Sequence, residues 1–396
     1  MSKNFDKVEL LVGDKEIHSG SFSPYDAGVC NFLDFFSKEL NKKSSKFYTD
    51  LKTLSFWCRK KNVEKIKKNF FTNEIRTGKG LIFHITPSNV PVNFMYSLIF
   101  GLLTGNSNIV RVPSKNFEQV KIICSLLKKL LKNKRFIYLR KKIKIVKYAN
   151  ENEGFTKYIS SLCDVRIIWG GDKSIENIRK FPIKSRSFDL TFADRYSICL
   201  INSDKLKKLN NFNLKLLVNK FYNDTYLFDQ NACSSPHLIF WIGKKNKITR
   251  EKFWNNLQEL VEKKYKLPEK AVYDKFSKLC VDSTILKNLN FQKKFGEMIY
   301  TLNLKKIDKK IENLRGKWGY FYEHEIKHMN EIKKVLNDKF QTLTYFGIKK
   351  DKLESFVKSN LLGIDRIVPI GQALEIGFVW DGYDINKTLT RIVDIK

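Results

Sequence analysis

The sequence contains few of the features that mark exported, metal-binding or membrane proteins. Its longest strongly apolar stretch, Val92 to Leu103, is about a dozen residues, short of the roughly 20 that span a bilayer. The first ten residues lack the apolar segment and cleavage site of a secretory signal. The seven cysteines form no CxxC pair and no Cys/His cluster with zinc spacing. These absences predict a cytoplasmic chain with no membrane span, no bound metal and reduced thiols.

Acidic residues are scarce relative to basic ones. The chain has 41 Asp and Glu against 74 Lys and Arg, a net charge of +33. The most basic segment, Lys128 to Lys147, contains no acid. Most of the cations are lysines, whereas readout of base edges favours Arg, Asn and Gln in specific geometry. We therefore interpret the charge first as a solvated surface, second as a surface for anionic partners such as CoA or an acidic acyl carrier, and only third as a nucleic-acid surface.

Repeats, low-complexity segments and long linkers are also missing, yet 396 residues exceed one ordinary core and indicate two or three closely joined domains. Short buried strands and amphipathic helices alternate along the first half of the chain. Such alternation is typical of a doubly wound α/β domain, in which ligands bind at the carboxyl ends of parallel strands. The expected strands are 78–85, 107–114, 142–148 and 165–169, and the expected helices are 50–68, 92–103, 117–132, 154–162 and 172–180.

The pattern changes after Tyr196. We expect strands at 197–201 and 238–242, a helix at 213–223 and a long helical stretch at 250–314. The predicted domains are 1–196, an N-terminal helical region with a dinucleotide-binding domain, 197–355, a smaller α/β domain, and 356–396, a segment that returns to the first domain.

Two features point to a bound dinucleotide, although no complete GxGxxG motif is present. Gly170–Gly171 separates a strand from a helix, where backbone N–H groups can receive a phosphate, and Ser174 could cap that helix. Arg111, Ser114 and Lys115 follow another strand, where cations suit the 2′-phosphate of NADP. Taken alone, each feature also fits a simpler interpretation, a tight turn or exposed charges.

Two loops contain candidate reactive groups. Cys233 lies in FDQNACSSP, among small and polar residues that favour an accessible nucleophile, although a buried thiol is the alternative. In HITPSNVP, Pro87 and Pro91 bracket Asn89, which could offer an amide to an oxyanion or cap a helix. His84 and His237 flank these loops and are weaker candidates for proton transfer. His324 and His328 would share a helix face, without further metal ligands nearby.

Read in order, several segments resemble the LuxC-like acyl-CoA reductase family, a branch of the aldehyde dehydrogenase superfamily. They span roughly residues 50–391 and are GKGLIFHITPSNVPVNF, FGLLTGNSNIVRVPSK, WGGDKSI, FADRYSICLI, FDQNACSSP, QTLTYFGI and DRIVPIGQALEIGFVWDGYD. The resemblance implies an aldehyde dehydrogenase-like α/β fold, with a Rossmann-type doubly wound cofactor domain and a smaller α/β catalytic domain.

The resemblance also implies roles for individual residues. Cys233 would be the nucleophile and Asn89 an oxyanion donor. Lys115 stands where NAD-preferring relatives tend to carry an acid, which favours NADPH. The expected cofactor-binding residues are Thr86, Pro87, Arg111, Ser114, Lys115, Gly170, Gly171 and Asp172.

The expected activity is NADPH-dependent reduction of an acyl thioester, on CoA or an acyl carrier, to an aldehyde through an acyl group on Cys233. Aldehyde-oxidising relatives use a glutamate base in a segment that here reads TFADRYS, with Thr191 near the place of the base and Asp194 offset from it. Three alternatives stay open, namely a CoA-acylating aldehyde dehydrogenase working oxidatively, an acyl phosphate reductase, and an inactive basic binding protein on the same fold. The expected partners are an acyl-protein synthetase and further copies of the chain.

Overall fold

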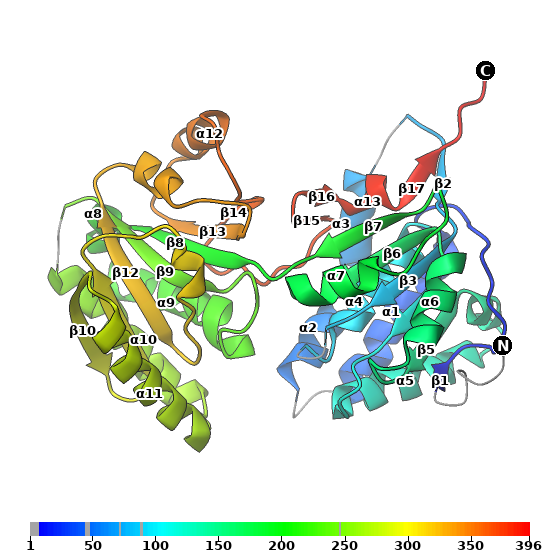
Figure 1. Ribbon diagram of the computed structural model, residues 1–396, viewed down its shortest axis with the longest axis horizontal. Coiled ribbons are helices and arrows are strands. Elements are labelled where there is room, and N and C mark those ends of the chain that lie inside the picture. The colour runs from blue at the N-terminus through cyan, green and yellow to red at the C-terminus, as the bar shows by residue number, and fades with distance from the viewer. Residues whose placement is uncertain (1–7, 44–47, 71–72, 88–89, 245–246) are drawn as a thin grey trace. The chain divides into compact units, whose positions relative to one another are not determined.

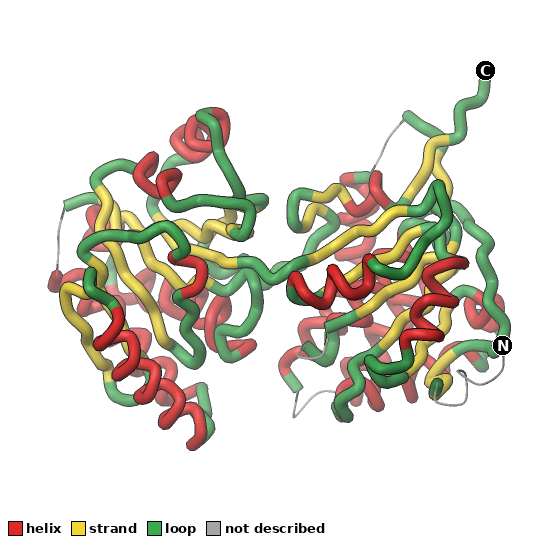
Figure 2. Tube along the Cα trace, viewed as in Figure 1, coloured by secondary structure: helices red, strands yellow, loops and turns green. Residues whose placement is uncertain are grey.

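The computed structural model describes residues 8–43, 48–70, 73–87, 90–244 and 247–396. The chain divides into two compact units, each with its own sheet (Figures 1 and 2). Unit 1 comprises Met1–Ala193 and Tyr383–Lys396, and unit 2 comprises Asp194–Gly382.

Unit 1 is built on a six-stranded sheet in the order β1-β5-β4-β3-β6-β7. Five of its strands are parallel to one another, and only the edge strand β1 pairs antiparallel, with β5. From β3 the chain proceeds through β4 to β5 on one side. It then returns to β6, on the other side of β3, so the strand order reverses between β3 and β6. This is a doubly wound topology, whose ligand crevice lies at the carboxyl ends of the strands flanking the reversal. The strands are β1 Glu9–Val12, β3 Leu81–Ile85, β4 Ser107–Arg111, β5 Ile143–Lys147, β6 Val165–Trp169 and β7 Phe188–Phe192.

Helices cover both faces of this sheet. Leu81, Phe83 and Ile85 of β3 point to one face, where they pack with Phe155 of α6 and Ile175 of α7. The other face carries α4, whose eleven residues are all buried because α1 contacts its outer side. The helices are α1 Ala27–Lys43, α2 Thr49–Trp57, α3 Lys60–Asn69, α4 Asn93–Leu103, α5 Glu118–Leu131, the 3₁₀ helix η1 Ile137–Lys141, α6 Glu153–Leu162 and α7 Asp172–Arg179.

The end of the chain adds a small second sheet to unit 1. Strand β17, Thr390–Ile392, pairs antiparallel with β2, Arg76–Gly78. Strand β16 and helix α13 precede it, at Tyr383–Asp384 and Ile385–Thr388. The C-terminal segment Tyr383–Lys396 therefore belongs to unit 1.

Unit 2 contains a seven-stranded sheet in the order β10-β11-β12-β9-β8-β13-β14, in which only β10 is antiparallel. Its strands are β8 Tyr196–Asn202, β9 Pro236–Ile242, β10 Leu289–Phe295, β11 Ile299–Leu304, β12 Tyr320–Ile326, β13 Phe340–Phe346 and β14 Arg366–Pro369, and a short strand, β15, covers Val379–Trp380. Apolar clusters lie on both faces of the sheet, one containing Phe221 and Trp254 and the other Leu279 and Phe356.

The helices of unit 2 correct one sequence prediction. The stretch expected to be helical over 250–314 contains two helices, α10 and α11, and then strands β10 and β11. Strand β10 reads LNFQKKF and lies at the edge of the sheet, where most of its side chains are exposed or half-buried. Because of its lysines, its sequence resembles that of a surface helix. The helices are α8 Ser203–Lys207, α9 Asn211–Thr225, α10 Lys247–Lys264, α11 Glu269–Ile285 and α12 Lys350–Lys358, with 3₁₀ helices η2 Tyr226–Phe228, η3 Ile311–Asn313 and η4 Met329–Lys334.

The boundaries of the two units lie near or after those of the predicted domains. The first crossing, between Ala193 and Asp194, is close to the predicted boundary after residue 196. Residues 356–382 belong to unit 2, so the return to unit 1 begins at Tyr383, later than the predicted residue 356. Across the described ranges, every helix is too short or too polar to cross a bilayer.

Candidate active site

The carboxyl edge of the unit 1 sheet gathers most of the residues predicted to bind a cofactor. Thr86 and Pro87 follow β3, and the Thr86 hydroxyl donates a hydrogen bond to the carbonyl oxygen of Arg111 at 2.7 Å. Gly170 follows β6, and its N–H donates to the Phe192 carbonyl at 3.1 Å. These bonds tie the end of β3 to β4 and the end of β6 to β7. The edge is therefore fixed where the topology places a ligand crevice.

Arg111 is turned inward at this edge. Its side chain is buried, donates to the Tyr148 carbonyl at 3.3 Å and to the Asn150 side chain, and lies over the Tyr148 ring. Burial lowers the pKa of the Arg111 guanidinium from its ordinary value. Its Nε atom is buried without a hydrogen-bond partner among the described residues. Arg111 therefore holds the loops after β4 and β5 together.

Ser114 and Lys115 are both exposed. Among the described residues, no ion pair engages the Lys115 ammonium, so this cation can meet a phosphate from solution. Asn89, the predicted oxyanion donor, lies outside the described residues. Its predicted role stays a prediction.

The glycine turn after β6 leads directly into α7. Gly171 is the N-cap, and a Cβ at this position would meet nothing within 4 Å. Asp172 is exposed in the first turn of α7. The prediction that Ser174 caps this helix is wrong, because Ser174 lies inside it and its N–H donates to the Gly171 carbonyl at 2.9 Å.

This edge fits the diphosphate of a dinucleotide. Open space at Gly171 lets a phosphate approach the backbone, and the positive end of the α7 dipole lies at this turn. Beside the turn, the rings of Trp169 and Phe192 stack with centroids 3.9 Å apart. The Trp169 indole N–H donates to Ser97 at 3.0 Å, which fixes the ring. Neither ring was predicted from the sequence to belong to a site.

In unit 2, the loop that carries Cys233 is organised by Gln230. This buried amide donates to the carbonyls of Pro236 and Tyr320 at 3.0 and 3.1 Å, and its oxygen accepts the N–H groups of Gly319 and Tyr320 at 3.1 and 3.2 Å. Its backbone is left-handed, with φ of 60°. Four hydrogen bonds therefore hold a conformation that non-glycine residues seldom adopt. The sequence signal was only its place in the cysteine motif.

Two serines hold the other side of the loop. The Ser197 hydroxyl donates to the Cys233 carbonyl at 2.6 Å, and it accepts the Thr342 N–H at 3.2 Å. The Ser235 hydroxyl donates to the Asp224 carbonyl at 2.7 Å. Cys233 consequently stands in a fixed turn immediately before β9, as a half-buried free thiol.

Several groups act on the Cys233 sulfur. Burial is the largest influence and raises the pKa of the thiol, while the Arg195 backbone N–H donates a hydrogen bond that lowers it. The carboxylates of Asp194 and Asp381 raise the thiol pKa further, and the Arg315 cation lowers it. The resting sulfur is therefore mostly protonated near neutral pH, and a base must take its proton before it attacks a carbonyl.

Asp381 is a buried carboxyl in this surrounding. Burial raises its pKa to about 6, and a hydrogen bond from the Gln341 amide opposes that rise. The Gln341 side chain in turn accepts the Thr342 hydroxyl at 3.3 Å. Because Thr342 also contacts Ser197, a continuous set of contacts joins Asp381 to the Cys233 loop.

The histidine candidates have structural roles. His84 is buried between Ser97 and Asn108, at 2.7 and 3.0 Å, and burial lowers its pKa to about 4. His237 is buried on β9 and accepts the Gly316 N–H, and burial lowers its pKa to about 3. The predicted helix face of His324 and His328 is wrong, because His324 lies in strand β12. No cluster of three potential metal ligands occurs within the described part of the chain.

The sequence of this chain is similar to those of known proteins over long stretches. Residues 59–392 match the family model of the acyl-CoA reductase (LuxC) family. A long-chain acyl-protein thioester reductase 2 of Photobacterium leiognathi is 26% identical over 167 residues, which are 42% of this chain and 32% of the relative. A long-chain acyl-protein thioester reductase of Photorhabdus luminescens is 22% identical over 332 residues, which are 80% of this chain and 63% of the relative. The matches thus cover from a third to just under two thirds of these relatives.

Solved structures resemble the fold. The aldehyde dehydrogenase KauB of Pseudomonas aeruginosa has a TM-score of 0.63 at 11% identity, covering 92% of this chain and 82% of that one. An NAD-dependent benzaldehyde dehydrogenase of Corynebacterium glutamicum has a TM-score of 0.61 at 11% identity, covering 94% and 85%. The predicted aldehyde dehydrogenase-like α/β fold is therefore confirmed. With the family model matched over most of its length, this chain belongs to the acyl-CoA reductase (LuxC) family.

Proposed function

We propose that this protein reduces an acyl thioester to an aldehyde, with Cys233 carrying the acyl group. The observation that carries the proposal is the Cys233 loop, in which a half-buried thiol lies in a turn fixed by Gln230 and Ser197 and receives a backbone N–H. A fixed, partly accessible thiol suits nucleophilic attack on a carbonyl. Membership of the family and the names of the matched relatives support the same reaction class.

The chemistry begins with the Cys233 proton. Once a base accepts it, the sulfur forms a bond to the thioester carbonyl carbon, and the carrier thiolate leaves and is protonated. The acyl group is then held on Cys233 as a thioester. A reduced nicotinamide dinucleotide, when bound, supplies the hydride that brings the acyl carbon to the aldehyde level. Cys233 is released as the thiolate when the aldehyde departs.

The residues near the expected place of a hydrolytic base also favour reduction of the acyl group over its hydrolysis. Thr191 on β7 stands near the place at which the resemblance puts the hydrolytic base, and a threonine hydroxyl is a poor base at neutral pH. The offset Asp194 is ion-paired with Arg315 at 2.7 Å, so its carboxylate is already engaged.

The nucleophile is tested by Cys233→Ala. We expect reduction of saturated acyl-CoAs, followed by NADPH absorbance, to fall by at least ~10³-fold, because the residue that takes the acyl group is gone. Intact mass should show an acyl adduct on the wild-type protein and none on the variant. Cys280→Ala is the matched control, because Cys280 is an exposed free thiol on α11. Turnover retained in Cys233→Ala would refute the assignment.

We further propose NADPH as the reductant, held by Gly170, Gly171, Thr86, Ser114 and Lys115. Exposed Lys115 is the cation free to meet a 2′-phosphate, since Arg111 is committed to Tyr148 and Asn150. Lys115→Glu should shift the ratio of NADPH to NADH rates toward NADH by about tenfold or more, the equivalent of one charge-assisted bond. Lys132→Glu, which places the same change at the end of α5, should leave the ratio unchanged. An unaltered ratio in Lys115→Glu would remove the 2′-phosphate assignment.

A further inference from the structure

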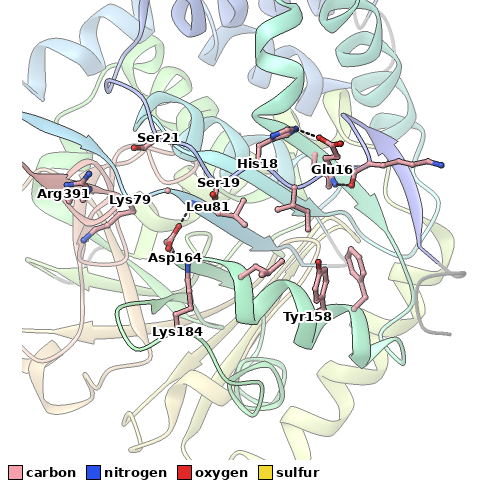
Figure 3. Close-up of a pocket in the computed structure, with 16 residues that line it drawn as sticks. Glu16, His18, Ser19, Ser21, Lys79, Leu81, Tyr158, Asp164, Lys184 and Arg391 are labelled. Atoms are coloured by element: carbon pink, nitrogen blue, oxygen red, sulfur yellow. Dashed lines mark hydrogen bonds and ion pairs between the residues drawn. The ribbon is translucent and has the colours of Figure 1, made fainter. Parts of the chain in front are cut away.

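A broad basin opens at the amino edge of the unit 1 sheet. It is lined by Leu81, the first residue of β3, by Asp164, which directly precedes β6, and by residues 15–19 and Ser21 (Figure 3). Its volume is about 840 Å³. The cofactor edge lies at the opposite, carboxyl ends of the same strands. The basin is therefore separate from the proposed dinucleotide site.

Two acidic residues line the basin, and one of them, Asp164, is already engaged. Asp164 accepts the Leu81 N–H at 2.7 Å and forms an ion pair with Lys184. The Glu16 carboxylate is mostly exposed and lies 3.8 Å from the His18 ring nitrogen, beyond hydrogen-bond distance. Lys144 is engaged too, because its ammonium donates to the Lys15 carbonyl at 2.5 Å and fastens the N-terminal segment.

Two cations at the rim have no such partner. Figure 3 shows Lys79 and Arg391 beside each other, from the turn before β3 and from β17. Partial burial lowers the pKa of the Lys79 ammonium, and repulsion from Arg76, Arg186 and Arg391 lowers it further. Within the described ranges, neither the Lys79 nor the Arg391 side chain forms an ion pair or hydrogen bond, and the Lys79 ammonium lies 5.4 Å from the centre of the Phe188 ring. The cations at this rim therefore repel one another, and a bound anion would offset this repulsion.

The remaining wall is apolar and aromatic. Leu81, Phe155, Tyr158 and Leu162 line it, the last three from α6. A ligand bound at the cations could therefore lay a less polar portion against this wall, while its charge faces Lys79 and Arg391.

We propose that this basin binds a small phosphate-bearing anion, with Lys79 and Arg391 as its principal contacts. A guanidinium offers two parallel N–H donors to phosphate oxygens, and a lysine ammonium adds a compact charge. The ligand is either a free diphosphate or a nucleotide whose base lies on the Phe155 and Tyr158 wall. The proposal is independent of the proposed reductase activity.

Calorimetric titration with inorganic pyrophosphate tests it. Ionic strength is held constant with NaCl so that general screening does not contribute, and the variants at Lys79 and Arg391 distinguish the basin from the cofactor edge. We expect saturable one-to-one binding to the wild-type protein. The double variant Lys79→Gln/Arg391→Gln should bind at least about tenfold more weakly. Lys132→Gln/Lys134→Gln, with the same loss of charge at the exposed end of α5, should bind as the wild type does.

The variant is expected to fold, because neutralising mutually repelling cations removes an unfavourable interaction, and its thermal midpoint should be no lower than that of the wild type. If the pair misfolds, the single variants Lys79→Gln and Arg391→Gln replace it. Equal affinity in the charge-neutralised and wild-type proteins, or no saturable binding, would overturn the proposal. ADP is titrated as a second arm. Tighter binding of ADP than of pyrophosphate identifies a nucleotide, and equal binding identifies the phosphate group alone.

Discussion

The cysteines of this chain differ in what surrounds each sulfur. Cys58 is fully buried, and burial alone raises the pKa of its thiol. Cys233 is buried less completely and is surrounded by charges of both signs together with a backbone N–H donor. Its protonation can therefore be tuned by neighbours, which an apolar pocket does not allow.

The signs of these neighbours lead to a paired prediction. Asp381→Asn removes a negative charge that disfavours the thiolate, so the pKa of Cys233 should fall. Alkylation of Cys233 by iodoacetamide at about pH 8 should therefore become several-fold faster. Arg315→Gln removes a positive charge, so alkylation should become slower. The rate is followed by mass spectrometry of the Cys233 peptide across a pH series. Asparagine tolerates the left-handed backbone of residue 381, whose φ is 48°.

The two substitutions must move the rate in opposite directions. A shift in the same direction would mean that access to the sulfur, rather than charge, limits the reaction. Cys280, exposed on α11, serves as the internal reference because its alkylation should be the same in all three proteins.

Single residues were predicted from the sequence only where type and loop context were informative. Cys233 stood out because small polar residues flank it, and the structure describes it as a half-buried free thiol. Arg111 was grouped with Lys115 by spacing alone, yet the fold turns it inward onto Tyr148. Such orientations depend on residues from another strand, which spacing along one segment does not reveal.

At the scale of elements, the Cys233 loop is held by the four hydrogen bonds of the Gln230 side chain, which we call the amide clamp. Gln230 bonds to backbone groups at the first residue of β9 and at the start of β12, so one side chain joins two neighbouring strands. A loop stabilised in this way keeps the thiol in place without flanking glycines. The clamp thus links the stability of unit 2 to the position of the reactive sulfur.

Gln230→Ala should therefore destabilise the protein by about 3 kcal/mol or more, because it leaves buried backbone donors and acceptors unpaired. Chemical denaturation followed by tryptophan fluorescence measures the change, since Trp241 and Trp254 lie in the core of unit 2. Asn231→Ala is the control, an exposed neighbour whose side chain makes one 3.3 Å contact with the Asp229 carbonyl, and it should change stability by less than about 0.5 kcal/mol. A loss below about 1 kcal/mol in Gln230→Ala would show that water replaces the clamp.

Most strands and helices of unit 1 were predictable because they bury one continuous apolar run each. Residues 165–180 show this, where a buried strand, a glycine turn and an amphipathic helix follow one another as expected. The expected helix at 50–68 is broken into α2 and α3 between Trp57 and Lys60. In unit 2 the signal failed at β10, because a solvent-facing edge strand rich in lysine has the composition of a surface helix.

At the scale of the whole molecule, the chain leaves unit 1 after Ala193 and re-enters it at Tyr383. The pairing of β2 with β17 records this return, since Arg76 is opposite Ile392. Strands of three residues show no periodicity of their own. The pairing therefore could not be derived from the residues, and only the resemblance of the late segments to a known family suggested a return.

The two crossings bear directly on the reactive sulfur. Asp194 and Arg195 are the first residues of unit 2 after one crossing, and Asp381 is two residues before the other. These three residues act on the Cys233 thiol, two through their carboxylates and one through its N–H. Unit 2 thus brings residues from its two ends in the sequence to one sulfur. The electrostatic control of Cys233 thus depends on residues at both ends of unit 2, and substitutions at either end should alter the reactivity of the thiol even where the cysteine motif is intact.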